Sequence, residues 1–96
     1  MRLRGRRDRN HAEIVKGLRA CGVRVLDLGN VGKGCPDILC GTPRGNTLIE
    51  IKAPGGTLTP DQVRFFAEWT GPKAVAESLQ EALRALGMAR DPHRAA

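Results

Sequence analysis

Hydrophobic positions in the first third of the chain follow two different periods. Apolar residues first recur at the three- and four-residue spacing of one helix face, at Ile14, Val15, Leu18 and Cys21. Asn10 is suited to cap the start of this helix, with Glu13 as its capping-box partner, and Gly22 is suited to end it. Residues 23–28 then alternate between apolar and polar, which predicts a strand.

The middle of the chain predicts a loop followed by a hairpin. Residues 29–34 contain three glycines and read as a loop. Two short apolar runs follow, at 37–40 and 47–53, and the turn residues at 41–46 separate them. We therefore expect an antiparallel pair of strands there.

The last third predicts a helix, a strand and another helix. Thr59 and Gln62 form a capping box at the start of a helix that should extend to about Thr70. Residues 73–77 suit a strand, and Ser78 begins a second capped helix that Gly87 ends.

The expected element order is α-β-β-β-α-β-α, an α/β fold with a small mixed sheet flanked by helices. Its 96 residues suit one domain, which we expect to span 10–90. The ends are predicted to be a basic arm over 1–9 and a loose tail over 91–96.

The charge balance points to a polyanionic partner. The net charge is +6, and five arginines lie in the first nine residues: Arg2, Arg4, Arg6, Arg7 and Arg9. A basic surplus favours phosphate contacts and counterion release. We count these arginines and Lys33 as candidate nucleic-acid-binding residues. The alternative for the arm is a solvated tail, because short charged termini are often disordered.

Other broad classes fit the composition poorly. No apolar run is long enough for a membrane span, and the basic N-terminus lacks the hydrophobic region of a secretory signal. An intracellular, cytoplasmic protein is the expectation. Three cysteines are an odd count for a disulfide framework, and their spacing does not suit a zinc site, which favours buried free thiols.

Charged residues interrupt the predicted hairpin in a pattern that suggests chemistry. Asp37 opens one strand, while Glu50 and Lys52 lie two apart on the next and therefore project from the same face. Two carboxylates and the carbonyl of Ile51 are oxygen ligands of the kind that Mg²⁺ prefers. Lys52 beside the ion can orient or help deprotonate a water and offset charge at phosphorus. The alternatives are a surface ion pair for Glu50 and Lys52, and a turn role for Asp37.

A predicted helix face adds an amide to this group. Gln62 shares the face with three aromatic residues, Phe65, Phe66 and Trp69. We expect this face to be buried, with Gln62 pointing inward near a helix end that favours anions. A purely capping role is the alternative for Gln62. Glu13 is equally consistent with a capping role and with a place in the active site.

The residues of these segments resemble a known family. The stretch G-C-P-D-I-L-C, followed by T-L-I-E-I-K-A-P-G-G-T-L-T-P-D-Q, is similar to the VRR-NUC domain of the PD-(D/E)XK nuclease superfamily. The match includes Glu13 and continues over 34–69. The combined motif is specific, whereas E-x-K alone is common.

The resemblance implies a Mg²⁺- or Mn²⁺-dependent phosphodiesterase acting on DNA, with a restriction-endonuclease-like core. It implies that Asp37 and Glu50 bind metal, that Lys52 is the catalytic lysine and that Gln62 supports the site. Glu13 matches the acidic residue of the family's first helix. Short members resemble homodimeric Holliday-junction resolvases of phages and bacteria.

Two other functions stay open at this point. One is a nuclease that acts on flaps or on DNA ends, which differs only in its substrate. The other is a basic nucleic-acid-binding module without catalysis, in which the carboxylates are structural. A pure phosphate binder gains nothing from carboxylates that face its ligand, so the acid pair favours an enzyme.

Overall fold

Four strands form one mixed sheet in the computed structural model, which describes the backbone of residues 2–88 and the side chains of residues 9–88. The sheet order is β1 (Arg24–Asp27), β2 (Ile38–Thr42), β3 (Gly45–Ile51) and β4 (Lys73–Ala76). Its first three strands are antiparallel, and β4 pairs in parallel with β3. The helices are α1 (Arg2–Ala20), α2 (Pro60–Glu68) and α3 (Leu79–Ala85), so the predicted α-β-β-β-α-β-α order is confirmed.

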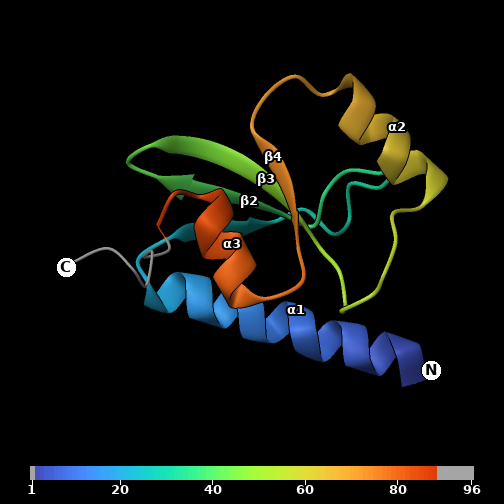
Figure 1. Cartoon of the computed structure of the whole chain (residues 1–96), viewed down its shortest axis with the longest axis horizontal. Helices are drawn as coiled ribbons and strands as arrows, with labels where there is room; N and C mark the ends of the chain where they lie inside the picture. Colours follow the sequence, from blue (N-terminus) through green and yellow to red (C-terminus); the bar gives the residue numbers. More distant parts are fainter. Residues whose placement is uncertain (1, 89–96) are drawn as a thin grey trace.

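The hydrophobic core lies between one face of this sheet and the pair α1 and α3 (Figure 1). From the helices come Ile14, Leu18 and Ala82; from the strands come Val25, Ile38, Cys40, Ile49, Ile51 and Ala76. Gly17 allows the two helices to approach, because a Cβ there would lie 2.4 Å from a methyl carbon of Leu79. This packed layer holds the strands in place and leaves the other face of the sheet for residues outside the core.

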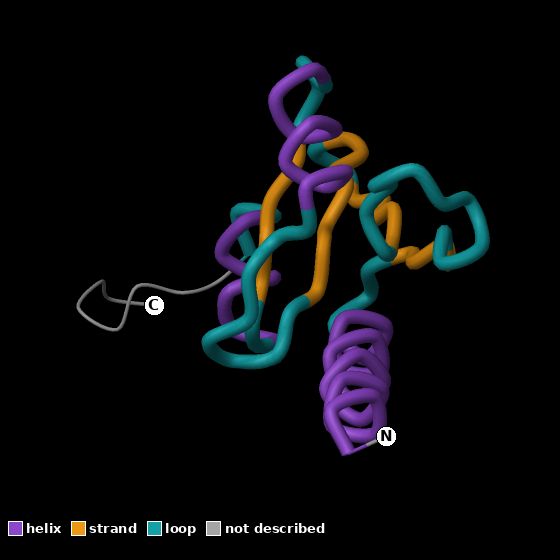
Figure 2. Tube along the Cα trace, turned by 90° about the vertical axis from the view of Figure 1, so that its right-hand side faces the viewer, coloured by secondary structure: helices purple, strands orange, loops and turns teal. Residues whose placement is uncertain are grey.

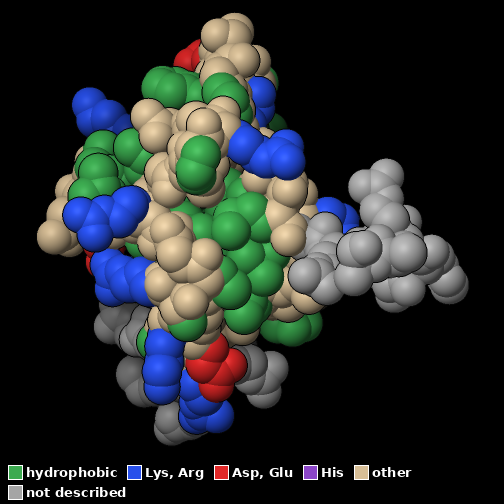
Figure 3. Space-filling model, turned by 90° about the vertical axis from the view of Figure 1, so that its left-hand side faces the viewer, with side chains coloured by type: hydrophobic (Ala, Val, Ile, Leu, Met, Phe, Trp, Pro, Cys, Tyr) green, Lys and Arg blue, Asp and Glu red, His purple; other side chains and the backbone are tan. Residues whose placement is uncertain are grey.

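The second sheet face has a different character. Strand register places Leu26, Leu39 and Leu48 opposite one another across β1, β2 and β3. Leu26 at the edge is 61% exposed, and Val75 on β4 is 40% exposed. Glu50 and Lys52 project from this face as well, because they alternate with the core residues Ile49 and Ile51. Figure 3 views the molecule from the left-hand side of Figure 1, and on that side hydrophobic side chains form a patch with Lys and Arg side chains around it.

Helix α2 lies on the opposite side of the strands from α1 in both ribbon views (Figures 1 and 2). The expectation that its aromatic face is buried was wrong. Phe65 and Phe66 are only partly buried, Trp69 is 44% exposed, and only Gln62 of this helix is buried. In the first turn of this helix, Asp61 and Gln62 lie against the loop at Gly34, and Gln62 contacts the sheet at Glu50.

The predicted start of the first helix was also wrong. The backbone is helical from Arg2, so Asn10 lies inside α1 and caps nothing. Arginine is a good helix former, which lets the helix extend through the basic segment. The Asn10 side chain instead donates to the carbonyls of Lys52, at 3.0 Å, and Glu77, at 3.3 Å. It therefore joins α1 to the end of β3, where the charged residues lie.

None of the described helices combines the length and hydrophobicity needed to cross a lipid bilayer.

Candidate active site

The hairpin of β2 and β3 brings two carboxylates to neighbouring strands. Ile38 pairs with Ile49, so the residues just beyond them, Asp37 and Glu50, lie across from each other. An Asp37 oxygen, Oδ2, accepts the backbone N–H of Ile51 at 2.8 Å. This bond holds the start of β2 against the end of β3 and fixes the Asp37 carboxylate there.

Glu50 is a fully buried carboxylate, at 0% exposure. Its Oε2 accepts a hydrogen bond from the Gln62 amide nitrogen at 2.9 Å, and the Lys52 ammonium lies 3.5 Å from the same oxygen. Burying a carboxylate is costly unless charge and hydrogen bonds compensate. The alternative of a surface ion pair is therefore wrong, because Glu50 and Lys52 form a buried pair.

Gln62 is oriented by the helix start that contains it. The predicted capping box is confirmed: the Thr59 backbone N–H donates to Gln62 Oε1 at 2.9 Å, and the Gln62 N–H donates to Thr59 Oγ1 at 3.2 Å. With the amide oxygen held by Thr59, the amide nitrogen is directed at Glu50. One side chain thus both caps α2 and binds the carboxylate.

The loop before Asp37 packs against the same helix turn at Gly34. This residue has a φ of +80°, and a Cβ there would lie 2.3 Å from the Asp61 carbonyl oxygen and 2.9 Å from the Gln62 nitrogen. Only glycine fits both the backbone conformation and the approach. Gly34 was predicted to lie in a loop and in the family motif, but no local pattern indicated this contact.

The surroundings of two cysteines raise the pKa values of their thiols. Burial, followed by the negative charges of Glu50 and Asp37, raises the pKa of the Cys35 thiol. Burial alone raises the pKa of Cys40 in the core to about 11. Both groups are held as neutral thiols at pH 7, which does not suit a cysteine nucleophile. All three cysteines are free thiols, but the expectation that they are buried holds only for Cys40, since Cys35 is partly buried and Cys21 is exposed.

The other candidate residues whose side chains the structure describes are exposed. Glu13 is exposed on α1, about one helical turn after Asn10. Arg9 is exposed on the same helix, and Lys33 is exposed in the loop that contains Gly34. The side chains of Arg2, Arg4, Arg6 and Arg7 lie outside the described residues. The sequence pattern predicts a capping role for Asn10. It gives no signal for the actual partners of Asn10, because these are 42 and 67 residues away along the chain.

The donor set fits a hard divalent cation that takes part of its coordination from water and substrate. Within residues 9–88, no group of three or more His, Cys, Asp or Glu side chains converges as a metal site. Two carboxylates, Asp37 and Glu50, do lie together, and Mg²⁺ is often bound by one or two carboxylates plus phosphate and water. A backbone carbonyl such as that of Ile51 is a ligand of the same kind.

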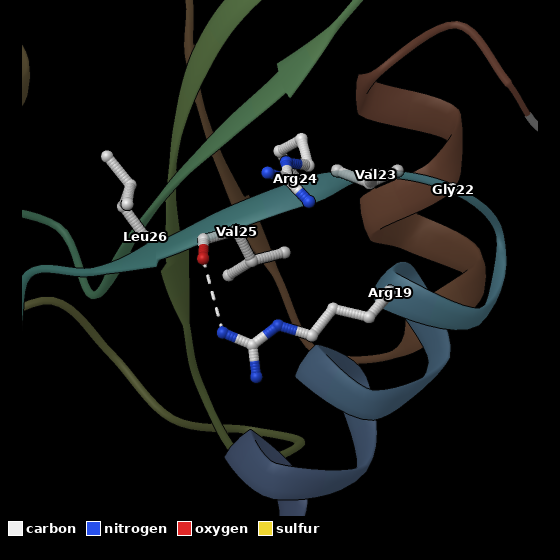
Figure 4. Close-up of a pocket in the computed structure, with 6 residues that line it drawn as sticks. All are labelled: Arg19, Gly22, Val23, Arg24, Val25 and Leu26. Atoms are coloured by element: carbon white, nitrogen blue, oxygen red, sulfur yellow. Dashed lines mark hydrogen bonds between the residues drawn. The ribbon is translucent and has the colours of Figure 1, made fainter.

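Two pockets lie beside β1 rather than over the carboxylates. One, of 470 Å³, is lined by Arg19, Gly22 and residues 23–26 (Figure 4). There the Arg19 guanidinium donates to the Val25 carbonyl at 3.2 Å, so it occupies a backbone acceptor at the sheet edge. A second, of 400 Å³, extends from Arg19 to His11 and Asp27. Neither contains a residue of the predicted catalytic group.

A comparison with family models matches the VRR-NUC domain over residues 7–82, which covers more than three quarters of the chain. The chain belongs to the VRR-NUC family. This is a PD-(D/E)XK nuclease-family domain, as the motif resemblance predicted. A search of curated proteins found no match, and neither did a search of solved structures. The matched region of this VRR-NUC domain contains Asp37, Glu50, Lys52 and Gln62.

The contact at Gly34 generates a prediction about catalysis. In the Gly34→Ala variant the added methyl group must push α2 or the loop away, and Gln62 then shifts relative to Glu50. We expect kcat for DNA cleavage to fall by about tenfold or more, because an ångström-scale misplacement is costly in catalysis. The substrate KM should change little.

Gly32→Ala is the matched control, since Gly32 also has a positive φ, +79°, but a Cβ there meets nothing within 4 Å. Both variants carry the same backbone strain, so the difference in kcat isolates the contact with α2. Equal kcat values for the two variants would remove the positioning role from Gly34.

Proposed function

We propose that this VRR-NUC domain is a Mg²⁺- or Mn²⁺-dependent endonuclease that hydrolyses phosphodiester bonds in branched DNA. Family membership implies a nuclease. The observation that carries the proposal is the buried Glu50 carboxylate beside Asp37, with Gln62 and Lys52 both directed at its Oε2. A fold that needed only stability would gain more from an apolar side chain at this position.

Each side chain has a distinct task in this proposal. Asp37, Glu50 and the Ile51 carbonyl are the residues that would hold the cation, which supplies Lewis acidity toward the phosphodiester. Lys52 orients the attacking water and offsets the negative charge that develops around phosphorus. Gln62 holds the Glu50 carboxylate in one orientation, so that little reorganisation accompanies the reaction.

The alternative of a non-catalytic binding module fits these contacts less well. In a protein that only bound phosphate, two carboxylates at the ligand would lower the affinity for it.

The free thiols and the absence of any disulfide among the described cysteines agree with the reducing cytoplasm that we propose for this enzyme, in a bacterium or a phage-infected cell.

The choice of branched DNA rests on a second proposal, that two copies of the chain act together. A two-fold dimer presents two equivalent sites at a fixed spacing, which matches the symmetry of a four-way junction. Leu26, exposed on the edge strand β1 and two strands away from Glu50, is apolar surface that a second copy can cover. A flap- or end-acting nuclease is the alternative, and cleavage of four-way, flapped, single-stranded and duplex DNA distinguishes them.

The metal role of the carboxylates is tested by Asp37→Asn and Glu50→Gln. Each should reduce cleavage in Mg²⁺ by at least about 100-fold, because each removes a charged ligand while preserving shape. Binding of Mn²⁺, followed by electron paramagnetic resonance without DNA, should weaken in both variants. Glu68→Gln on the exposed side of α2 is the control. Normal Mn²⁺ binding by either variant would remove that carboxylate from the metal site.

The role of Lys52 is tested by separating binding from chemistry. In Lys52→Ala the single-turnover rate on saturating DNA should fall about 100-fold or more, since one electrostatic or acid–base group is removed. DNA affinity should fall little, because one phosphate contact among several is a small part of binding. Lys16→Ala, exposed on α1, is the matched control. A normal rate on bound DNA together with weak affinity would make Lys52 a binding residue.

The basic segment at the start of α1 is proposed to contact the DNA backbone. The first turn of α1 contains no acidic residue, and a helix N-terminus itself favours anions. Replacing Arg2, Arg4, Arg6, Arg7 and Arg9 by Gln preserves helix propensity and removes the charge. The slope of log K against log salt should then become shallower, by about 0.9 for each phosphate that the arginines neutralise. An unchanged slope would identify this segment as a solvated tail.

A further inference from the structure

The aromatic side chains on α2 and at its C-cap residue form a stack outside the hydrophobic core. The rings of Phe65 and Trp69 lie 5.4 Å apart with an interplanar angle of 13°, and Phe66 meets Phe65 edge-on at 6.4 Å. None of the three belongs to the hydrophobic core cluster. Trp69, at the end of the stack, is 44% exposed. A large aromatic ring is thus held in a fixed orientation with much of its surface open.

Three neighbouring residues, Phe65, Gly71 and Lys73, surround Trp69. Phe65 covers one ring face, and Gly71 leaves room at the ring edge, because a Cβ there would lie 2.8 Å from the indole nitrogen. The Lys73 ammonium donates to the Trp69 backbone carbonyl. The stack with Phe65 orients the ring before any ligand arrives, which lowers the entropy lost on binding.

The stack is continuous with the candidate active site. Gln62, which donates to Glu50, begins the same helix face that carries Phe65 and Trp69. Seven residues separate Gln62 from Trp69, a rise of about 10 Å along a helix. A DNA strand that keeps the duplex rise of about 3.4 Å per base covers that distance in roughly three nucleotides.

The exposed area of Trp69 distinguishes between two possible ligands of this surface, a second protein and a nucleobase. Aromatic side chains bury about 150–250 Å² each, so the open part of Trp69 amounts to roughly 110 Å². A stable protein interface needs about 800 Å² from each partner. The open part of Trp69 alone is far smaller than one side of such an interface, and it matches the face of one nucleobase.

The charges near the stack also suit a nucleic-acid strand. Lys73 lies at the Trp69 end of the helix, and Lys33 is exposed on the loop that packs against the first turn. Of the two acids on α2, Asp61 is paired with Arg64 at 3.1 Å, while Glu68 is exposed. Cations at both ends of the helix can contact phosphates on either side of a stacked base.

We propose that Trp69, supported by Phe65, stacks against an unpaired base of the DNA strand about three nucleotides from the cleaved bond. This inference rests on the proposed nuclease function and, among its candidate substrates, favours the flap-acting alternative over a fully paired four-way junction. A base inside an intact duplex has both faces covered by its neighbours, so the platform favours DNA with unpaired nucleotides near the cut. Base stacking on an aromatic side chain contributes about 1–3 kcal/mol per base.

The test uses the intrinsic fluorescence of the full chain, because Trp69 is its one tryptophan. The probe is a flapped DNA, compared with a blunt duplex and with the same flap carrying abasic sites, all in Ca²⁺ to measure binding without relying on cleavage. The flap should quench Trp69 fluorescence strongly. The duplex and the abasic flap should quench it little, since neither offers an unpaired base.

Affinity measurements on variants complete the test. Trp69→Ala should weaken binding of the flap by about 5- to 150-fold and binding of the duplex hardly at all, which is the stacking energy expressed as affinity. Trp69→Phe should recover most of the affinity. Val63→Ala, at a residue of the same helix that is 54% exposed, is the matched control and should bind normally. Circular dichroism checks that each variant is folded.

Two results would overturn the inference. One is equal quenching, or an equal loss of affinity in Trp69→Ala, for the flap and the duplex. The other is a change of molar mass by light scattering when Trp69 is replaced, which would assign this face to a second copy. Because no readout depends on cleavage, an inactive protein that still shows flap-specific quenching would count against the nuclease and not against the stacking platform.

Discussion

The buried carboxylate of Glu50 is the interaction on which the arrangement of this domain depends. A carboxylate at 0% exposure destabilises a fold unless its charge is compensated. Compensation comes from Lys52 on the same strand and from Gln62 on α2. The second contact crosses from the sheet to α2, so the compensation of Glu50 also holds the first turn of this helix against the sheet.

The two faces of the sheet have different roles: one packs in the hydrophobic core, and the other carries the charged residues of the proposed site. Alternation along β3 sends Ile49 and Ile51 into the core with α1 and α3, and sends Glu50 and Lys52 to the opposite side. The charged residues therefore lie on a packed layer whose aliphatic side chains hold the strands in register. Asn10 adds a direct link, because it joins α1 to the carbonyl of Lys52. A rigid support of this kind is what a preorganised site requires.

Two glycines near α2 serve the site through the space they leave. Gly34 lets the loop before Asp37 contact the first turn of the helix, and Gly71 lets the Trp69 indole lie flat against Phe65. The nine-residue helix α2 therefore has a carboxylate-binding amide in its first turn and an exposed aromatic ring at its C-cap residue. In the proposed enzyme, this helix joins the reacting phosphate to the recognition of the strand.

Local signals in the sequence determined the element order, the hairpin and the capping box of Thr59 and Gln62, since turn residues, period and caps act over a few positions. They also placed Glu50 and Lys52 on one strand face. Only the tertiary structure decided the rest. Whether a helix face is buried depends on what packs against it, so the stripe of Phe65 and Trp69 looked like core and is not. Asn10 found its partners more than 40 residues away, and the contact of Gly34 with Asp61 joins segments whose proximity no local pattern encodes.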